Sequence, residues 1–245
     1  MLNPASWFKS APPVARAPLA APAPTRDEPK ATSAPGTGSV VVPIRSIGSG
    51  QIEHIAAHLL SLEPHDRYLR FGYAANDEQI RRYVHQLNFE RDELFGIFNR
   101  KLKLIAMAHL AFSVDPSCTS CAEFGVSVAR AARGRGYGRR LFERAVMHAR
   151  NEGVSQLFVH ALTENTAMLK IARRAGALIE RDGPESEAHL RLPPADFDSR
   201  VTELVNQQVA ITDYHLKAQA KQFWSVLGLL QEIRQGVREA RERVR

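Results

Sequence analysis

Three glycines and four arginines stand together near the middle of the chain, in the segment RGRGYGRR at residues 133–140. A run with helical spacing follows immediately. Amide groups at the start of a helix have no partner within the helix, and the helix dipole adds partial positive charge there. Glycine lets such amides approach a ligand closely. The segment therefore predicts a site for a phosphate or diphosphate, with arginine side chains adding charge-assisted contacts.

Three other interpretations of this segment fit less well. A Walker P-loop requires Gly-Lys-Ser or Gly-Lys-Thr, which is absent here. A dinucleotide fingerprint of the form GxGxxG fails because Arg139 occupies the position of the last glycine. An RGG-like RNA-binding segment is usually disordered, whereas this one lies between a predicted strand and a predicted helix. We therefore expect no nucleic acid partner.

The elements around this segment alternate between strand and helix patterns. Apolar runs predict strands at 40–44, 93–98, 102–112, 122–129, 156–162, 177–181 and 187–192. Helices are expected after Ser49, after Asn76, after the glycine segment as far as Gly153, and from Asn165 to Gly176. This alternation predicts an α/β or α+β fold in which helices flank one mixed sheet.

Both ends of the chain differ from this middle part. Residues 1–38 are rich in Pro and Ala and predict a disordered tail, with a docking arm for a partner as the alternative. Residues 39–193 form the expected domain, and 194–245 predict a helical extension. Apolar residues from Phe223 to Val237 recur there at helical spacing before an arginine-rich end. This helix would pack on its own domain or on a second subunit, giving a homo-oligomer, or lie on a membrane surface.

Two motifs together resemble a known superfamily. The pattern Arg-x-x-Gly-x-Gly, formed by Arg133, Gly136 and Gly138, resembles the acyl-CoA signature of the GNAT superfamily of N-acetyltransferases. The segment HALTENTAMLKIARRAGALIE at 160–180 resembles the part that closes the other side of the cofactor, with Asn165 at the matching asparagine. DRYLRFGY (66–73) and AEFGVSV (122–128) are most similar to the acetyltransferase domains of bacterial protein-lysine acetyltransferases. We expect a free-standing relative of these domains.

The resemblance covers roughly residues 40–192 and implies how a donor would bind. It implies a sheet splayed between the strands at 122–129 and 156–162, with acetyl-CoA as the acyl donor and no metal. The pantetheine arm would lie in the gap, hydrogen-bonded to backbone near Val126 and Val128. The pyrophosphate would lie on amides of the glycine segment, with the implied cofactor-binding residues being Arg133, Gly134, Arg135, Gly136, Tyr137, Gly138, Arg139 and Asn165.

The resemblance also suggests the catalytic groups. Acetyl transfer needs a neutral amine, and a lysine with a pKa near 10.4 is almost wholly protonated at pH 7, so a base is required. Glu123 matches the glutamate with that role in the lysine-acetylating relatives; the alternative is an exposed carboxylate paired with an arginine. Many of these enzymes carry a tyrosine seven residues after the asparagine, where this chain has Ala172. His160 is a substitute acid for the leaving thiolate, or else a core histidine.

Two further pairs of residues have less specific signals. Tyr68 and Arg70 would border the channel for the acceptor amine, or else pack and pair near a helix end. Cys118 and Cys121 would form a redox-sensitive pair in the loop before the catalytic strand, or be two ordinary loop cysteines. Two cysteines are too few for a disulfide scaffold, and CxxC without a second pair does not predict a zinc site.

The composition limits the class of protein. The chain has 245 residues and a formal net charge of +7, which suits an anionic ligand. Pro and Arg interrupt the apolar stretches near the N-terminus, and no apolar run reaches the roughly 18 residues of a membrane span; with few cysteines, this favours the cytoplasm. The sequence predicts an N-acetyltransferase acting on a protein lysine or a small amine. The alternative is an acyl-CoA-binding regulatory module without turnover.

Overall fold

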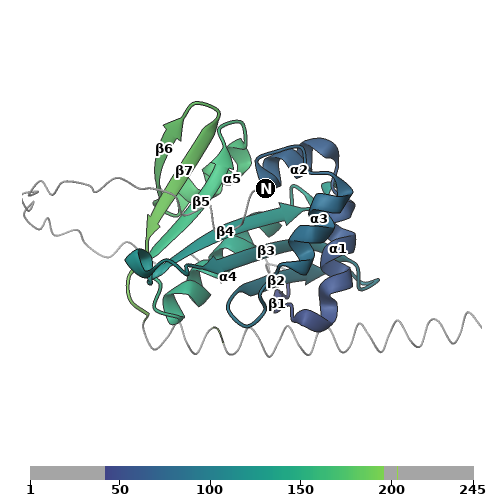
Figure 1. The fold of residues 1–245 in the computed structure, drawn as a ribbon, viewed down its shortest axis with the longest axis horizontal. Coiled ribbons are helices and arrows are strands. Elements are labelled where there is room, and N and C mark those ends of the chain that lie inside the picture. Colours follow the sequence, from purple (N-terminus) through teal and green to yellow (C-terminus); the bar gives the residue numbers. More distant parts are fainter. Residues whose placement is uncertain (1–41, 196–202, 204–245) are drawn as a thin grey trace, which may run out of the picture. The chain divides into compact units, whose positions relative to one another are not determined.

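Seven strands form one mixed sheet in the computed structural model, which describes residues 42–195 and Glu203 (Figure 1). The strand order is β1-β2-β3-β4-β5-β7-β6. The strands are β1 (Arg45–Ser46), β2 (Glu93–Phe98), β3 (Leu104–Phe112), β4 (Cys121–Val128), β5 (Gln156–Leu162), β6 (Leu178–Asp182) and β7 (Glu185–Arg191). The predicted α/β class with a mixed sheet is confirmed.

All neighbouring strands are antiparallel except the central pair β4 and β5. These two run parallel and pair only from Cys121–Gln156 to Glu123–Phe158. In contrast, β5 pairs with β7 along its whole length, from Gln156 to Leu162. The sheet therefore consists of two halves that meet along a short parallel seam.

Five α-helices within residues 42–195 flank this sheet. They are α1 (Ile52–Leu60), α2 (Pro64–Phe71), α3 (Asp77–His85), α4 (Tyr137–Asn151) and α5 (Thr166–Arg174). Successive side chains of a strand point to opposite faces of the sheet, so the β4 residue that a helix contacts shows which face the helix covers. His58 of α1 reaches Ser127, while Gly138 of α4 lies against Val128. Helices α1–α3 thus cover one face, and α4 covers the other together with its neighbour α5.

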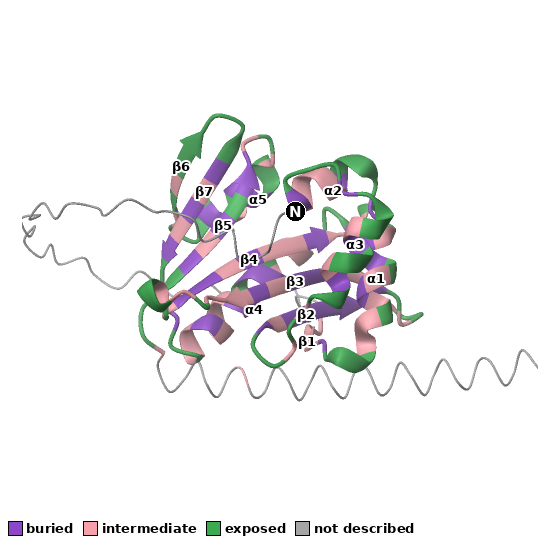
Figure 2. Cartoon of the chain, viewed as in Figure 1, coloured by how far each residue is buried: buried purple, intermediate pink, exposed green. Residues whose placement is uncertain are grey.

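The core on the two faces is built differently. Beneath α1 and α3, fully buried aliphatic side chains pack against the sheet, among them Ile55, Leu59 and Ile80. Beneath α4, the rings of Phe124 and Phe142 meet edge to face with centroids 5.0 Å apart. Figure 2 shows that the strands between these two layers of helices are mostly buried, whereas the tip of the β6–β7 hairpin is exposed.

Two expectations about the elements were wrong. The strand expected at 40–44 is not present over residues 42–44. The first strand, β1, begins only at Arg45 and has two residues. Helix α2 was not expected, although Pro64 at its first position and left-handed Gly72 just after its end are typical helix boundaries. The expected tail over 1–38 and the apolar helical residues from Phe223 onward lie outside the described residues.

Two further contacts involve β4 and α4. Cys118 and Cys121 are joined by a disulfide bond at the start of β4. Glu203 lies against α4, where its carboxylate accepts hydrogen bonds from Arg144 and His148, both at 2.6 Å, and from Asn151. Within the described ranges, no helix has the length and apolar character needed to cross a membrane.

Candidate active site

The short seam between β4 and β5 leaves a gap at the centre of the sheet. From Phe124 onward, β4 pairs with β3 on one side and with no described strand on the other. Figure 1 shows the two strands diverging beyond the seam. Val126 and Val128 lie on this unpaired stretch of β4, so their backbone can form hydrogen bonds with a ligand in the gap.

The glycine segment forms the turn between β4 and α4. Gly134 and Gly136 both have left-handed backbones, with φ of 75° and 74°. This conformation costs other residues roughly 1–2 kcal/mol. A Cβ atom placed at either position would meet no atom within 4 Å, so packing within the protein does not require glycine there. Backbone conformation and open space above the turn account for these two glycines.

Helix α4 begins without a side-chain cap. Its N-cap residue is Gly136, and the first cap bond is the amide of Arg140 donating to the carbonyl of Gly136 at 3.1 Å. The six amides of residues 134–139 donate to no acceptor among the residues that the structure describes. Together with the helix dipole, such amides favour an anion, so the turn suits the diphosphate predicted for it.

The arginines of the segment differ in their partners. Arg133 forms an ion pair with buried Asp66 of α2, and its Nε also donates to the carbonyl of Val128 at 3.3 Å. Arg139 forms an ion pair with Glu143 one turn along α4, at 2.9 Å. Arg135 is exposed and has no ion-pair partner in the described part of the chain. Arg133 therefore joins the turn to α2.

The remaining residues that the sequence predicts to bind the cofactor lie at the starts of α4 and α5. Tyr137 is the first residue of α4 and Gly138 the second, with Gly138 close to Ile171 of α5. Asn165 follows β5 on the other side of the gap, and its side-chain oxygen accepts a hydrogen bond from the amide of Met168 at 3.2 Å. It caps α5, which accounts for its position without a ligand.

Glu123 lies at the inner end of the seam. It is half-buried and faces the same side of the sheet as α1–α3. Burial raises the pKa of Glu123 above its ordinary value, the positive charges of His160 and Arg70 oppose this effect, and Glu187 adds to it. A partly buried carboxylate with a raised pKa is a suitable general base. The alternative of an exposed carboxylate does not fit this burial.

His160 lies next along β5 on the same face as Glu123. It is exposed, and its Nε2 lies 3.8 Å from a carboxylate oxygen of Glu187 on β7. The alternative of a buried core histidine was therefore wrong for this residue. Ala172, in the place of the tyrosine of many relatives, is fully buried in α5. It offers no proton to a leaving group.

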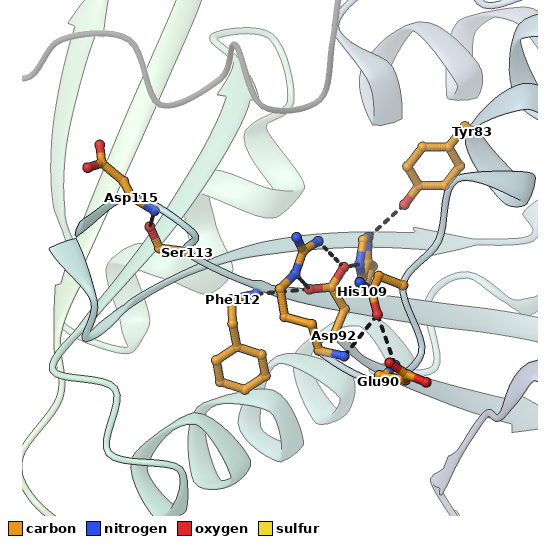
Figure 3. A network of polar contacts seen from close by, with 9 residues as sticks. Tyr83, Glu90, Asp92, His109, Phe112, Ser113 and Asp115 are labelled. Carbon is orange, nitrogen blue, oxygen red and sulfur yellow. Dashed lines mark hydrogen bonds and ion pairs between the residues drawn. The ribbon is translucent and has the colours of Figure 1, made fainter. Parts of the chain in front are cut away.

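The sequence interpretation missed a polar network on the α1–α3 face. Figure 3 shows Tyr83 of α3 pointing to His109 of β3, which in turn contacts Asp92 just before β2. A second buried histidine, His58, contacts Ser127 of β4 at 2.9 Å. Polar residues within the apolar runs of 52–60 and 104–112 were the available signal. Among the described residues, no His, Cys, Asp or Glu group could hold a metal ion.

Comparison with known proteins bears on residues 58–177, which match the acetyltransferase (GNAT) family. The GNAT domain of Streptomyces lividans PAT is 20% identical with a TM-score of 0.52, over 61% of this chain and 89% of that one. A GNAT-family acetyltransferase from Streptococcus pneumoniae is 15% identical with a TM-score of 0.50, over 61% of this chain and 98% of that one. At these identities the structural similarity concerns the fold. No curated protein matches the chain.

Proposed function

We propose that the chain, which contains a GNAT acetyltransferase domain matched over residues 58–177, is an N-acyltransferase that moves an acetyl group from acetyl-CoA to a primary amine. The observation that carries this proposal is the uncapped start of α4 beside the gap between β4 and β5. Its amides suit a diphosphate, and the gap suits a narrow thioester arm.

In the proposed reaction, Glu123 accepts a proton from the ammonium group of the acceptor. The neutral nitrogen then attacks the thioester carbonyl carbon, so that a carbon–nitrogen bond forms and the carbon–sulfur bond breaks. Holding both reactants in the gap supplies much of the acceleration. As the carbon–sulfur bond breaks, the nitrogen loses its second proton, and the leaving thiolate takes up this proton through His160 or water; a thiol with a pKa near 8.5 needs little assistance.

The acceptor is proposed to be a protein lysine or a small amine. Glu123, Glu187 and His160 face the acceptor side of the sheet, and the carboxylates suit a cationic amine. A lysine-containing peptide, free amino acids and a polyamine are therefore the first acceptors to compare. The assay would follow release of the CoA thiol at a fixed acetyl-CoA concentration.

One observation favours a second function, an acyl-CoA-binding module without turnover. Ala172 leaves no tyrosine at the position that protonates the leaving group in many relatives. If acetyl-CoA binds but none of the acceptors increases thiol release, this second function would replace the first. Acceptor-dependent release that Glu123→Gln slows would instead support the acetyltransferase.

Donor binding is tested directly by calorimetric titration with acetyl-CoA and with dephospho-CoA, which keeps the diphosphate. The parent should bind both, and Gly136→Glu should lose at least about 100-fold in affinity, because a carboxylate would oppose the diphosphate. Gly153→Glu is the matched control. Gly153 also has a left-handed backbone and open space, but it lies just past the other end of α4. A parent that binds neither ligand would overturn the proposed function.

A further inference from the structure

Arg70 of α2 lies directly on the backbone of β4. A Cβ atom added to Gly125 would be 2.7 Å from Cζ and Nη2 of Arg70 and 2.8 Å from Nη1. The guanidinium group therefore occupies the space that a side chain at position 125 would fill. Gly125 and Glu123 are two residues apart on one strand, so both face the same side of the sheet. Glycine at 125 brings this positive charge to the face that carries Glu123.

A chain of hydrogen bonds holds Arg70 in this place. Its Nη2 donates to the hydroxyl oxygen of Tyr83 at 3.0 Å. Since a guanidinium group can only donate, the hydroxyl hydrogen is directed to Nδ1 of His109, 2.8 Å away. Nε2 of His109 then donates to Asp92 at 3.2 Å (Figure 3). Every member has a defined donor and acceptor role.

Packing against aromatic rings also holds the Arg70 guanidinium in place. The Arg70 guanidinium lies over the ring of Phe71 at 5.3 Å and over that of Tyr83 at 5.6 Å. These two rings also meet edge to face, with centroids 5.3 Å apart. At the far end, Asp92 accepts two hydrogen bonds from Arg91 and one from the amide of Phe112. The network therefore ties α2 and α3 to β3, to β4 and to the residue that precedes β2.

The charges in the network are stable around neutral pH. Burial opposes the charge of Asp92, but hydrogen bonds from Arg91 and His109 outweigh it and lower the pKa of Asp92 to about 2. Burial lowers the pKa of His109 and raises that of Tyr83. Asp92 is thus an anion while His109 and Tyr83 are neutral. Arg70 has no carboxylate partner within residues 42–195, so no direct ion pair neutralises it.

The charge of Arg70 acts on the carboxyl group of Glu123. The groups that face it are Arg70 from α2, Tyr83 from α3, His160 from β5 and Glu187 from β7, with Asp92 acting on it only through the network. Burial and Glu187 favour the neutral acid. Arg70 and His160 favour the carboxylate, but an imidazole can lose its charge whereas a guanidinium group cannot. Arg70 is the permanent positive charge of this set.

We propose that Arg70 is a positioning residue for the general base: Tyr83, His109 and Asp92 hold its guanidinium against Gly125, and from there its charge favours the carboxylate form of Glu123. This inference rests on the proposed function for the role of Glu123 as a base. The hydrogen bond from Arg70 to Tyr83 is needed because an arginine side chain without it would move to solvent. Glycine at 125 is needed because any side chain there would displace the guanidinium.

The test follows the titration of Glu123 itself, by carbon-13 NMR of the side-chain carboxyl in the full chain without ligand. Arg70→Gln should raise the titration midpoint of Glu123 by about 1 pH unit. Arg70→Lys should restore part of the parent value. Gly125→Ala should also raise the midpoint, although it removes no charge, because the displaced atoms are the end of a flexible side chain. Tyr83→Phe should have a smaller effect in the same direction.

Arg82→Gln is the matched control, because it removes the same charge from a side chain on α3 that is 63% exposed and bound to Glu78. It should leave the midpoint of Glu123 unchanged. A merely structural role for Arg70 would lower the melting temperature of Arg70→Gln and Gly125→Ala without moving the midpoint, and that result would overturn the inference. Arg70→Lys provides the same comparison if Arg70→Gln does not fold.

This readout is separate from the proposed function. If the parent fails to bind acetyl-CoA while the midpoint moves as expected, the electrostatic role of Arg70 stands and the enzyme assignment fails. If acetyl transfer is found but the titration midpoint of Glu123 does not move in the Arg70 variants, the enzyme assignment stands and the electrostatic role of Arg70 fails. Where both hold, the acidic limb of the kcat/KM profile should move with the NMR midpoint in each variant.

Discussion

The two faces of β4 are held to their helices by different kinds of contact. On one face, Ser127 and Gly125 meet His58 and Arg70, both polar groups from α1 and α2. On the other, Phe124 and its neighbours pack on the apolar side of α4. The polar face restricts the position and charge of groups near Glu123, whereas no side chain caps the start of α4 beside the other face. In the proposed function, one strand would thus separate the requirements of catalysis from those of donor binding.

The same contrast appears between two helix starts. Asn76 and Gln79 form a capping box at the start of α3, in which each side chain bonds to the other's backbone amide at 2.9 Å. Helix α4 starts at Gly136 with no side-chain cap. The capping box thus satisfies two amides at the start of α3, whereas no side chain does so at the start of α4, where the amides can bind an anion. Four changes test these contrasts.

The largest effect is expected on the apolar face. Phe142→Ala should lower the free energy of unfolding by about 3–5 kcal/mol, since the ring is fully buried against Phe124. Denaturant unfolding would measure this, and the loss should be equal at pH 5 and pH 7. Val114→Ala, at a side chain that is 58% exposed, is the control. A pH-dependent loss would contradict an apolar origin.

The polar face should respond to pH through His58. Burial lowers the pKa of His58 from 6.5 to about 4, so protons bind the unfolded chain more readily. The free energy of unfolding should therefore fall by about 3 kcal/mol as pH drops from 6.5 to 4, and this contribution should be fully present above pH 6.5. His58→Gln should make this slope shallower, as measured by urea unfolding at several pH values, while His109, whose pKa burial also lowers, keeps its own contribution.

His85→Gln is the control for this experiment, because His85 is exposed on α3. Its variant should keep the slope of the parent. Asp92 and Glu203 have pKa values of about 2 and would contribute mainly below pH 4, outside this window. An unchanged slope in His58→Gln would mean that another group causes the pH dependence.

A smaller effect is expected at the turn before α4. Gly136→Ala should cost roughly 1–2 kcal/mol in stability because its backbone is left-handed. Gly153→Ala should cost a similar amount for the same reason. Only the change at position 136 should weaken acetyl-CoA binding, measured by calorimetry. Equal affinities in the two variants would place the donor elsewhere.

The smallest effect is expected at the start of α3. Asn76→Ala removes the capping box and should cost about 1 kcal/mol in thermal or denaturant unfolding. Because these amides serve only the protein, acetyl-CoA affinity should not change. A loss of affinity would show that the two helix starts are not separate in function.

The parts predicted well from the sequence depend on neighbouring residues. The start of α3 after Asn76, the strand β4 and the glycine turn each lie within a few consecutive positions, where backbone preferences are strong. The network of Tyr83, His109 and Asp92 joins residues from three elements, so no local pattern could predict it. The position of Arg70 depends on Gly125, a residue 55 positions away along the chain. Such contacts are set by the packing of helices on the sheet.

The strand order also governs when the gap can exist during folding. Strand β5 holds β4 through three residue pairs but β7 through seven, so it depends mainly on a strand that is synthesised later. A nascent chain that has not yet emerged as far as Arg191 would present β5 with an open edge, and such edges attract other chains. One wall of the proposed donor site would thus be completed late, and a ribosome-bound intermediate should depend on chaperones at that stage.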